Sequence, residues 1–319
     1  MTILGRTGLD VFGLQLGGNP FGHTADEATS HAILDRYAAA GGNFIDTADV
    51  YSAWIDGNSG GESETIIGTW LASRRNRDTQ IVATKVGGLE PYRTLTRANV
   101  RAGLDASLRR LQTDYVDLYY LHRDDTDTPQ EETLEALDEL VREGKVRHIG
   151  ASNFTADRLR SAIEVSRAHG WSEFTVVQDD YSLVNRAHYE HGTREVALEY
   201  DLVNLPFRSL AKGFLAGKYR PGVPYEESTH TPIGSSYVDR YGATVLPVLD
   251  RLAEKHGVPV AAIGLAWVTT QPTIAVPLSG SRTIEQLEQA LPVVGVQLAE
   301  GEAAELTALT EPEPAVVGS

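Results

Sequence analysis

Short apolar segments alternate with longer amphipathic segments along almost the whole chain. The amphipathic segments carry apolar residues three or four positions apart and several of them end at glycine, which is typical of helices. The apolar segments predict strands over residues 12–18, 43–46, 80–85, 115–122, 146–152, 174–178, 202–207 and 273–278. Helices are predicted over residues 26–42, 62–73, 97–111, 130–145, 156–170, 187–200, 241–257, 261–271 and 283–291.

This alternation predicts parallel strands that are joined by right-handed helical crossovers. Eight strand–helix units without a break in composition favour a closed (β/α)₈ TIM barrel, with an N-terminal hairpin, over a doubly wound sheet. No linker divides the chain, so we expect a single domain over residues 1–319. Two long connections, at 52–61 and about 211–236, predict long βα loops, which in a barrel form the active site.

Composition narrows the function classes. The 319 residues are 41% hydrophobic and 23% charged, which is ordinary for a globular protein, and they include no cysteine. Thiolate catalysis, disulfides and cysteine-bound metals are therefore excluded. A formal net charge of -16 argues against nucleic-acid binding, and no secretory or membrane-spanning segment is recognisable, which predicts a cytoplasmic protein without membrane contact.

Candidate chemistry stands at the carboxyl ends of consecutive predicted strands. Asp46, Lys85 and His122 each end an apolar segment, and Tyr51 follows Asp46 in the next loop. Taken singly, each is explained equally well as a turn cap, a polar strand end or a packed loop residue. Together they would meet at one mouth of a barrel.

These four residue types suit protonation of an oxygen that acquires negative charge, as when hydride reaches a carbonyl carbon. A free tyrosine has a pKa of about 10, and a nearby lysine is expected to lower that pKa. Asp46 would act as the counter-ion of a buried Lys85. His122 would polarise the carbonyl oxygen or help to pass the proton.

Several segments in order resemble the aldo-keto reductase family: NFIDTADVY, IVATK, YYLHRDD, IGASNF, QDDYSLVNR, SLAKGFLAGKYR and GSRTIEQLE. The similarity spans about residues 4–291. It implies the barrel fold and reduction of an aldehyde or ketone with NADPH. It also implies Tyr51 as general acid, Lys85 and Asp46 as its tuning pair, and His122 as the residue that orients the carbonyl.

The resemblance further implies a cofactor site. Ser152, Asn153 and Gln178 would contact the nicotinamide carboxamide, Phe207 would stack on its ring, and Arg282 would meet the 2′-phosphate, which favours NADP over NAD. The remaining implied cofactor contacts are Arg208, Ser209, Leu210, Lys212, Gly213, Lys218, Gly280, Ser281 and Gln286. For Lys218, and for Arg220 close by, solvated surface charge is the better interpretation.

The sequence departs from the family pattern at a few positions. Gln289-Ala290 replaces a common Glu-Asn pair at the adenine end, and Arg208 follows Phe207 where an aromatic or small residue is frequent. The substrate pocket is expected to include Asn19, Trp54, Arg123 and the loops 52–61 and 219–236. Asn19 and Arg123 favour a polar carbonyl compound, for example one derived from a sugar.

Two other functions fit the same residues less well. One is a cofactor-binding regulatory subunit that senses redox state, and the other is a barrel isomerase or lyase without nicotinamide. No metal site is predicted, because His188 and His191 lack an accompanying HExxH pattern and the acidic run 124–128 lacks the glycine and glutamate of a calcium loop. Oligomeric state and the physiological direction of the reaction are not determined by the sequence.

Overall fold

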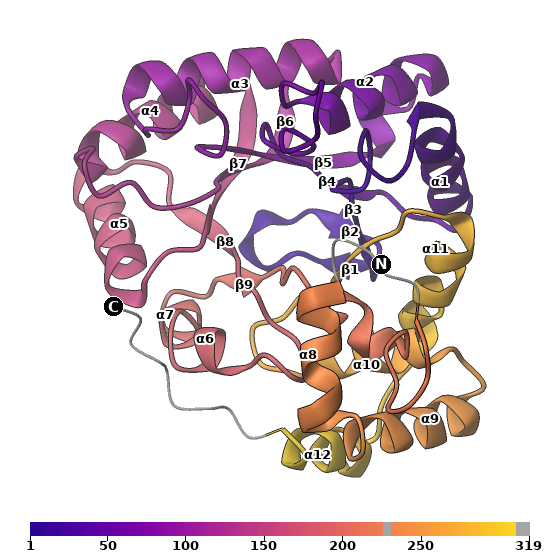
Figure 1. Cartoon of the computed structure of the whole chain (residues 1–319). Coiled ribbons are helices and arrows are strands. Elements are labelled where there is room, and N and C mark those ends of the chain that lie inside the picture. The colour runs from indigo at the N-terminus through magenta and orange to yellow at the C-terminus, as the bar shows by residue number, and fades with distance from the viewer. Residues whose placement is uncertain (226–230, 311–319) are drawn as a thin grey trace.

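Eight parallel strands form the centre of the molecule in a computed structural model, which describes residues 1–225 and 231–310 (Figure 1). Their order in the sheet is β10-β3-β4-β5-β6-β7-β8-β9. The strands are β3 (Gln15–Gly17), β4 (Phe44–Asp46), β5 (Ile81–Val86), β6 (Val116–Leu121), β7 (Val146–Ser152), β8 (Phe174–Gln178), β9 (Val203–Asn204) and β10 (Leu278–Gly280).

The two ends of this sheet meet. Asn204 of β9 forms an isolated parallel bridge with Ile274, and the Asn204 amide donates a hydrogen bond of 2.7 Å to the carbonyl oxygen of Thr273. The strands alternate with helices that lie outside the sheet, as Figure 1 shows for α1 to α5. The predicted (β/α)₈ TIM barrel is therefore confirmed.

The helices lie close to the predicted positions, except for those at 231–241 and 300–308, where no helix was predicted. They are α1 (Glu27–Ala39), α2 (Glu62–Arg74), α3 (Arg97–Leu111), α4 (Gln130–Arg142), α5 (Ala156–His169), α6 (Ala187–Glu190), α7 (Arg194–Glu199), α8 (Thr231–Tyr241), α9 (Val245–His256), α10 (Val260–Thr269), α11 (Ile284–Ala290) and α12 (Glu300–Ala308). Short 3₁₀ helices are η1 (Gly5–Thr7), η2 (Arg77–Thr79), η3 (Ala211–Ala216) and η4 (Leu291–Gly295). Side chains of Asp26, Thr96, Thr155 and Thr283 cap helix N-termini.

An antiparallel hairpin, β1 (Thr2–Ile3) and β2 (Asp10–Val11), precedes the barrel. Leu4 and Val11 are fully buried and pack in one cluster with Phe44 and Ile81, the first residues of β4 and β5. The hairpin therefore covers the amino-terminal end of the barrel. The carboxyl-terminal end is left to the βα loops.

Three predicted elements differ from the structure. The helix expected over 187–200 is split into α6 and α7, because a turn around Gly192 separates them. The strand expected over 273–278 begins only at Leu278, and residues 274–277 contribute an isolated bridge. The helix expected over 241–257 begins at Val245, because Tyr241 is instead the end of α8.

The long connection expected over 211–236 contains η3 and the start of α8, and its residues 226–230 lie outside the described part of the chain. In the part of the chain that the structure describes, no helix has both the length and the apolar composition needed to cross a membrane.

Candidate active site

The ends of five neighbouring strands bring the predicted catalytic residues together. Asp46 and Gln178 are the last residues of β4 and β8, Lys85 is the penultimate residue of β5, and His122 follows β6 directly. Parallel pairing aligns these ends, with Ser152 at the end of β7 opposite Gln178. All of them lie at the carboxyl-terminal mouth, where the βα loops of a barrel place active sites.

Lys85 is the centre of a buried hydrogen-bond cluster. Its Nζ donates to Asp46 Oδ2 at 2.6 Å, to the carbonyl oxygen of Thr47 at 2.7 Å and to Tyr51 Oη at 3.1 Å. The three N–H groups of the ammonium are thereby satisfied, although the residue is 0% exposed. The sequence-based expectation that Asp46 would be the counter-ion of a buried Lys85 agrees with this geometry.

Asp46 is bonded on both of its oxygens. Oδ2 accepts from Lys85 and, at 3.4 Å, from the Tyr51 hydroxyl, while Oδ1 accepts from Gln178 Nε2 at 3.0 Å. We call Asp46, Tyr51, Lys85 and Gln178 the strand-end cluster. Since each member is held by at least one other, the cluster is rigid before any ligand arrives.

The direction of the Tyr51 pKa shift differs from the expectation drawn from the sequence. Burial of the phenol and the negative charge of Asp46 raise the pKa of Tyr51 well above its usual value, so proximity to Lys85 does not produce a lowered pKa here. Burial also lowers the pKa of Lys85, against the opposing effect of Asp46. Tyr51 is therefore held as a neutral phenol that retains its proton.

His122 lies beside the phenol as a neutral imidazole. Its ring centroid is 6.0 Å from that of Tyr51 in an edge-on arrangement. Burial, together with the charges of Lys85 and Arg123, lowers the pKa of His122 to about 3. A side chain at Gly88 would place its Cβ only 3.0 Å from His122 Nδ1, so the loop after β5 can approach the imidazole only because residue 88 is glycine.

The residues expected to contact the carboxamide are linked to one another. Ser152 Oγ donates to the carbonyl oxygen of Gln178 at 2.6 Å, and Asn153 Nδ2 donates to Ser152 Oγ at 3.0 Å and to the carbonyl oxygen of His122 at 2.9 Å. Asn153 has a positive φ of 57°. These three polar side chains thus form one patch that adjoins both His122 and the strand-end cluster.

The loop after β9 has an unusual backbone. Arg208, Ala211, Lys212 and Gly213 all have φ values between 48° and 98°, a left-handed conformation, and the amides of Ala211 and Gly213 donate to the carbonyl oxygens of Arg208 and Leu210. Arg208 donates to Asp180 Oδ2 at 2.6 Å, and its guanidinium carbon lies 5.4 Å from the Phe207 ring centroid. Ser209 is buried and donates to the carbonyl oxygen of Pro206, whereas Leu210 is partly buried.

The other predicted cofactor residues divide into two groups. Gly280 ends β10 and is exposed, Ser281 is buried, and the amide of Arg282 donates to Gln286 Oε1 at 3.1 Å. The Arg282 side chain makes no hydrogen bond or ion pair within residues 1–225 and 231–310. By contrast, Arg220 is paired with Asp250 through two contacts of 2.7 Å, and Lys218 lies 5.0 Å from the ring centroid of Tyr219.

The predicted substrate residues lie in loops. We call Asn19, Trp54 and Arg123 the loop set. Trp54 is 52% exposed and contacts His23 edge-on, with 5.9 Å between ring centroids. Asn19 follows β3 and is partly buried, while Arg123 is exposed. The part of the expected pocket at 226–230 falls outside the described residues.

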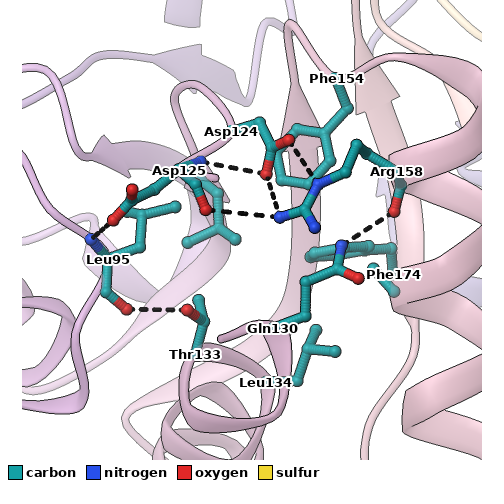
Figure 2. A pocket seen from close by; sticks show the side chains of 11 residues that line it. Leu95, Asp124, Asp125, Gln130, Thr133, Leu134, Phe154, Arg158 and Phe174 are labelled. Carbon is teal, nitrogen blue, oxygen red and sulfur yellow. Dashed lines mark hydrogen bonds and ion pairs between the residues drawn. The ribbon is translucent and has the colours of Figure 1, made fainter. Parts of the chain in front are cut away.

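The acidic run 124–128 is structural (Figure 2). Asp124 forms a two-point ion pair with Arg158 of α5 at 2.7 and 2.9 Å. Asp125 accepts from the amide of Leu95 and from the Thr128 hydroxyl, each at 2.7 Å. These bonds hold the loop after β6 beside a small pocket whose lining also includes the apolar rings of Phe154 and Phe174 and the polar side chains of Gln130 and Thr133.

Sequence reasoning missed a buried acidic group below the site. Asp49, in the loop between β4 and Tyr51, is fully buried, and its carboxyl oxygens have no hydrogen-bond partner among the described residues. Burial, together with the charge of Glu64, raises the pKa of Asp49 to about 7. Glu64 itself is bonded to Thr84 and Arg110. Its position in the sequence, between the candidate residues Asp46 and Tyr51, could have identified Asp49 as part of the site.

Comparison with known proteins identifies the family of the chain. Residues 13–311 match the model of the aldo/keto reductase family. The chain is 33% identical to Protein tas of Escherichia coli, over 95% of each chain. It is 34% identical to the uncharacterized oxidoreductase YrpG of Bacillus subtilis, over 93% of this chain and 91% of the relative. It is also 33% identical to the norsolorinic acid reductase stcV of Emericella nidulans, over 87% and 71%. The chain therefore belongs to the aldo/keto reductase family of oxidoreductases.

Proposed function

We propose that this protein reduces an aldehyde or ketone to the alcohol with NADPH, and that Tyr51 supplies the proton. The observation that carries the proposal is the strand-end cluster, in which a neutral phenol is fixed by Lys85 and Asp46 at the barrel mouth. A family of oxidoreductases and a reductase among the relatives support the same type of chemistry. A polar, for example sugar-derived, carbonyl compound is the substrate class that the loop set suggests.

The residues present fit a dinucleotide phosphate. The loop after β9, with its positive φ values at Arg208 and from Ala211 to Gly213, would bring its backbone close to a pyrophosphate, and Lys212 would add positive charge there. The Arg282 guanidinium, which has no partner among the described residues, offers a fork suited to a 2′-phosphate. Phe207 presents a ring for stacking, and Ser152, Asn153 and Gln178 offer hydrogen-bonding groups to a carboxamide.

A bound nicotinamide cofactor would supply the hydride for the carbonyl carbon, and the residues of this chain would act on the carbonyl oxygen. Neutral His122 donates a hydrogen bond to the carbonyl oxygen and orients it towards Tyr51. The Tyr51 hydroxyl then transfers its proton to that oxygen. The raised pKa of Tyr51 does not prevent this step, because an alkoxide is a far stronger base than a phenolate. Lys85 stabilises the phenolate that remains, because it already donates to Tyr51 Oη.

Titration with NADPH and, separately, with NADH tests the cofactor assignment. Quenching of the fluorescence of the four tryptophans reports binding. We expect NADPH to bind more tightly, and Arg282→Gln to weaken NADPH binding by about 10- to 100-fold through loss of a charge-assisted contact. NADH, which lacks the 2′-phosphate, is the internal control and should bind both proteins alike.

The other outcomes decide between functions. If neither nucleotide binds, the reductase proposal must be withdrawn. If NADPH binds tightly but a broad panel of aldehydes and ketones is not reduced, a redox-sensing regulatory subunit becomes the better interpretation. An equal loss of NADPH and NADH binding in the Arg282 variant would contradict the role of Arg282 in recognising the phosphate.

A further inference from the structure

Arg123 is an exposed cation that has no counter-ion among the described residues, and it lies next to the proposed carbonyl-orienting residue. It follows His122 directly in the loop after β6. Within residues 1–225 and 231–310, its guanidinium makes neither a hydrogen bond nor an ion pair. The charge of Arg123 nevertheless acts on His122, since it contributes to the lowered pKa of that imidazole.

The acidic residues that follow Arg123 in the chain do not neutralise it. Figure 2 shows both carboxylates bonded elsewhere, Asp124 to the Arg158 guanidinium and Asp125 to the amide of Leu95. Asp125 also accepts from the hydroxyl of Thr128. The carboxylates of the two residues that follow Arg123 are therefore held in other bonds, and the loop leaves the guanidinium available.

Arg208, another arginine of the βα loops, has the opposite status. Its guanidinium is paired with Asp180 at 2.6 Å, so its charge is already compensated. The chain as a whole carries a net charge of -16, which repels anions in general. An uncompensated arginine beside His122 is therefore a local exception to the charge of the protein, and it suits an anionic group on a bound molecule.

We propose that Arg123 binds a carboxylate of the substrate, and that the preferred substrates are carbonyl compounds that also carry a carboxylate. The inference deepens the proposed reductase function and rests on it. A guanidinium fork matches the two oxygens of a carboxylate. The exposed indole of Trp54, in the loop after β4, offers an apolar surface to the body of such a molecule. Reduction at the carbonyl carbon leaves the carboxylate unchanged.

Matched substrates test this inference. We choose 3- and 4-carboxybenzaldehyde and their methyl esters, which keep the ring and the aldehyde but lose the negative charge. For each pair, the ratio of kcat/KM for the acid to kcat/KM for the ester is measured with NADPH. Arg123→Gln should lower this ratio by about 10- to 100-fold for at least one pair, mainly through KM, because one charge-assisted contact is lost. Arg123→Lys should restore part of it.

Arg109→Gln is the matched control, because it removes the same charge from the exposed face of α3. It should leave the ratio within about threefold, because salt screens the effect of a charge that is exposed to solvent. An unchanged ratio in Arg123→Gln, or an equal fall in Arg109→Gln, would overturn carboxylate recognition by Arg123, while reduction of the esters would still support the reductase. If the wild-type protein reduces neither the acids nor the esters, the reductase proposal fails together with this inference.

Discussion

The strand-end cluster and the loop set lie at the same mouth of the barrel but differ in how their side chains are held. Asp46, Lys85 and Gln178 are at most 2% exposed, and each is hydrogen-bonded to another member of the cluster. Trp54 and Arg123 are exposed, and Arg123 has no polar partner among the described residues. The strand-end cluster has its hydrogen-bond partners without a ligand, whereas the loop set has side chains that remain available to contact one.

The difference follows from where the residues stand. Strand ends are fixed by the parallel ladders on either side, so a side chain placed there has a defined position. Loops run over the surface and tolerate changes, which is why they carry specificity in many folds. We therefore expect substitutions in the strand-end cluster to affect turnover and stability strongly, and substitutions in the loop set to affect the choice of substrate.

Tyr51→Phe should have the largest effect on turnover. Loss of the proton donor is expected to lower kcat by about 10²- to 10⁴-fold, while NADPH binding changes little. Steady-state kinetics and fluorescence titration measure the two quantities. Tyr120→Phe is the matched control, since its buried hydroxyl has no partner among the described residues and its ring lies 5.9 Å from Lys85 Nζ. Undiminished turnover in Tyr51→Phe, or an equal loss in Tyr120→Phe, would contradict the proposed role of Tyr51.

Lys85→Met should have the largest effect on stability. It leaves the Asp46 carboxylate buried without its cation, a change that costs about 3–5 kcal/mol when a buried ion pair is broken. Urea unfolding measures the loss. The double variant Lys85→Met/Asp46→Asn removes the orphaned charge and should be more stable than the single variant. If both variants are equally stable, the pair is not coupled and the cluster is held by packing alone.

Asp49→Asn tests whether the buried Asp49 carboxyl makes the free energy of unfolding depend on pH. The carboxyl has a pKa of about 7 in the folded protein and 3.8 as its ordinary value. Between pH 4 and pH 7 the folded state therefore binds one more proton than the unfolded state. The raised pKa stabilises the folded protein below about pH 4, and this stabilisation is lost as the pH rises through 7. The loss amounts to about 4 kcal/mol at most.

The Asn variant lacks this pH dependence, so its stability relative to the wild-type protein should increase between pH 5 and pH 8. Urea unfolding at both values measures the difference. His122, whose lowered pKa acts in the opposite direction, is the same in both proteins and cancels. Asp56→Asn is the matched control, because it removes the same charge from an exposed position of the same loop. A difference that does not change with pH would show that Asp49 is ionised alike in the folded and unfolded chain.

Most of the fold was predictable from local pattern. Each strand–helix unit carries its own hydrophobic periodicity and capping residues, such as Thr96 and Thr155, so the eight units and the barrel follow from short-range information. The unit at 187–200 and the strand near 278 were less well predicted. There the ends of the elements depend on a turn at Gly192 and on pairing with β3, which lies far away in the chain.

The sequence by itself determined the barrel and the residues at its strand ends, because the regular architecture of a barrel fixes where the strand ends lie. Only the tertiary structure decided which of those residues form hydrogen bonds with one another and in which direction their pKa values shift. Gln178 reaches Asp46 across 132 positions of the chain, and burial reverses the expected direction of the Tyr51 pKa. It also decided that Arg208 is paired, whereas Arg123 has no such partner in the described part of the chain. Charge pairing and desolvation depend on contacts between distant segments, which no local pattern records.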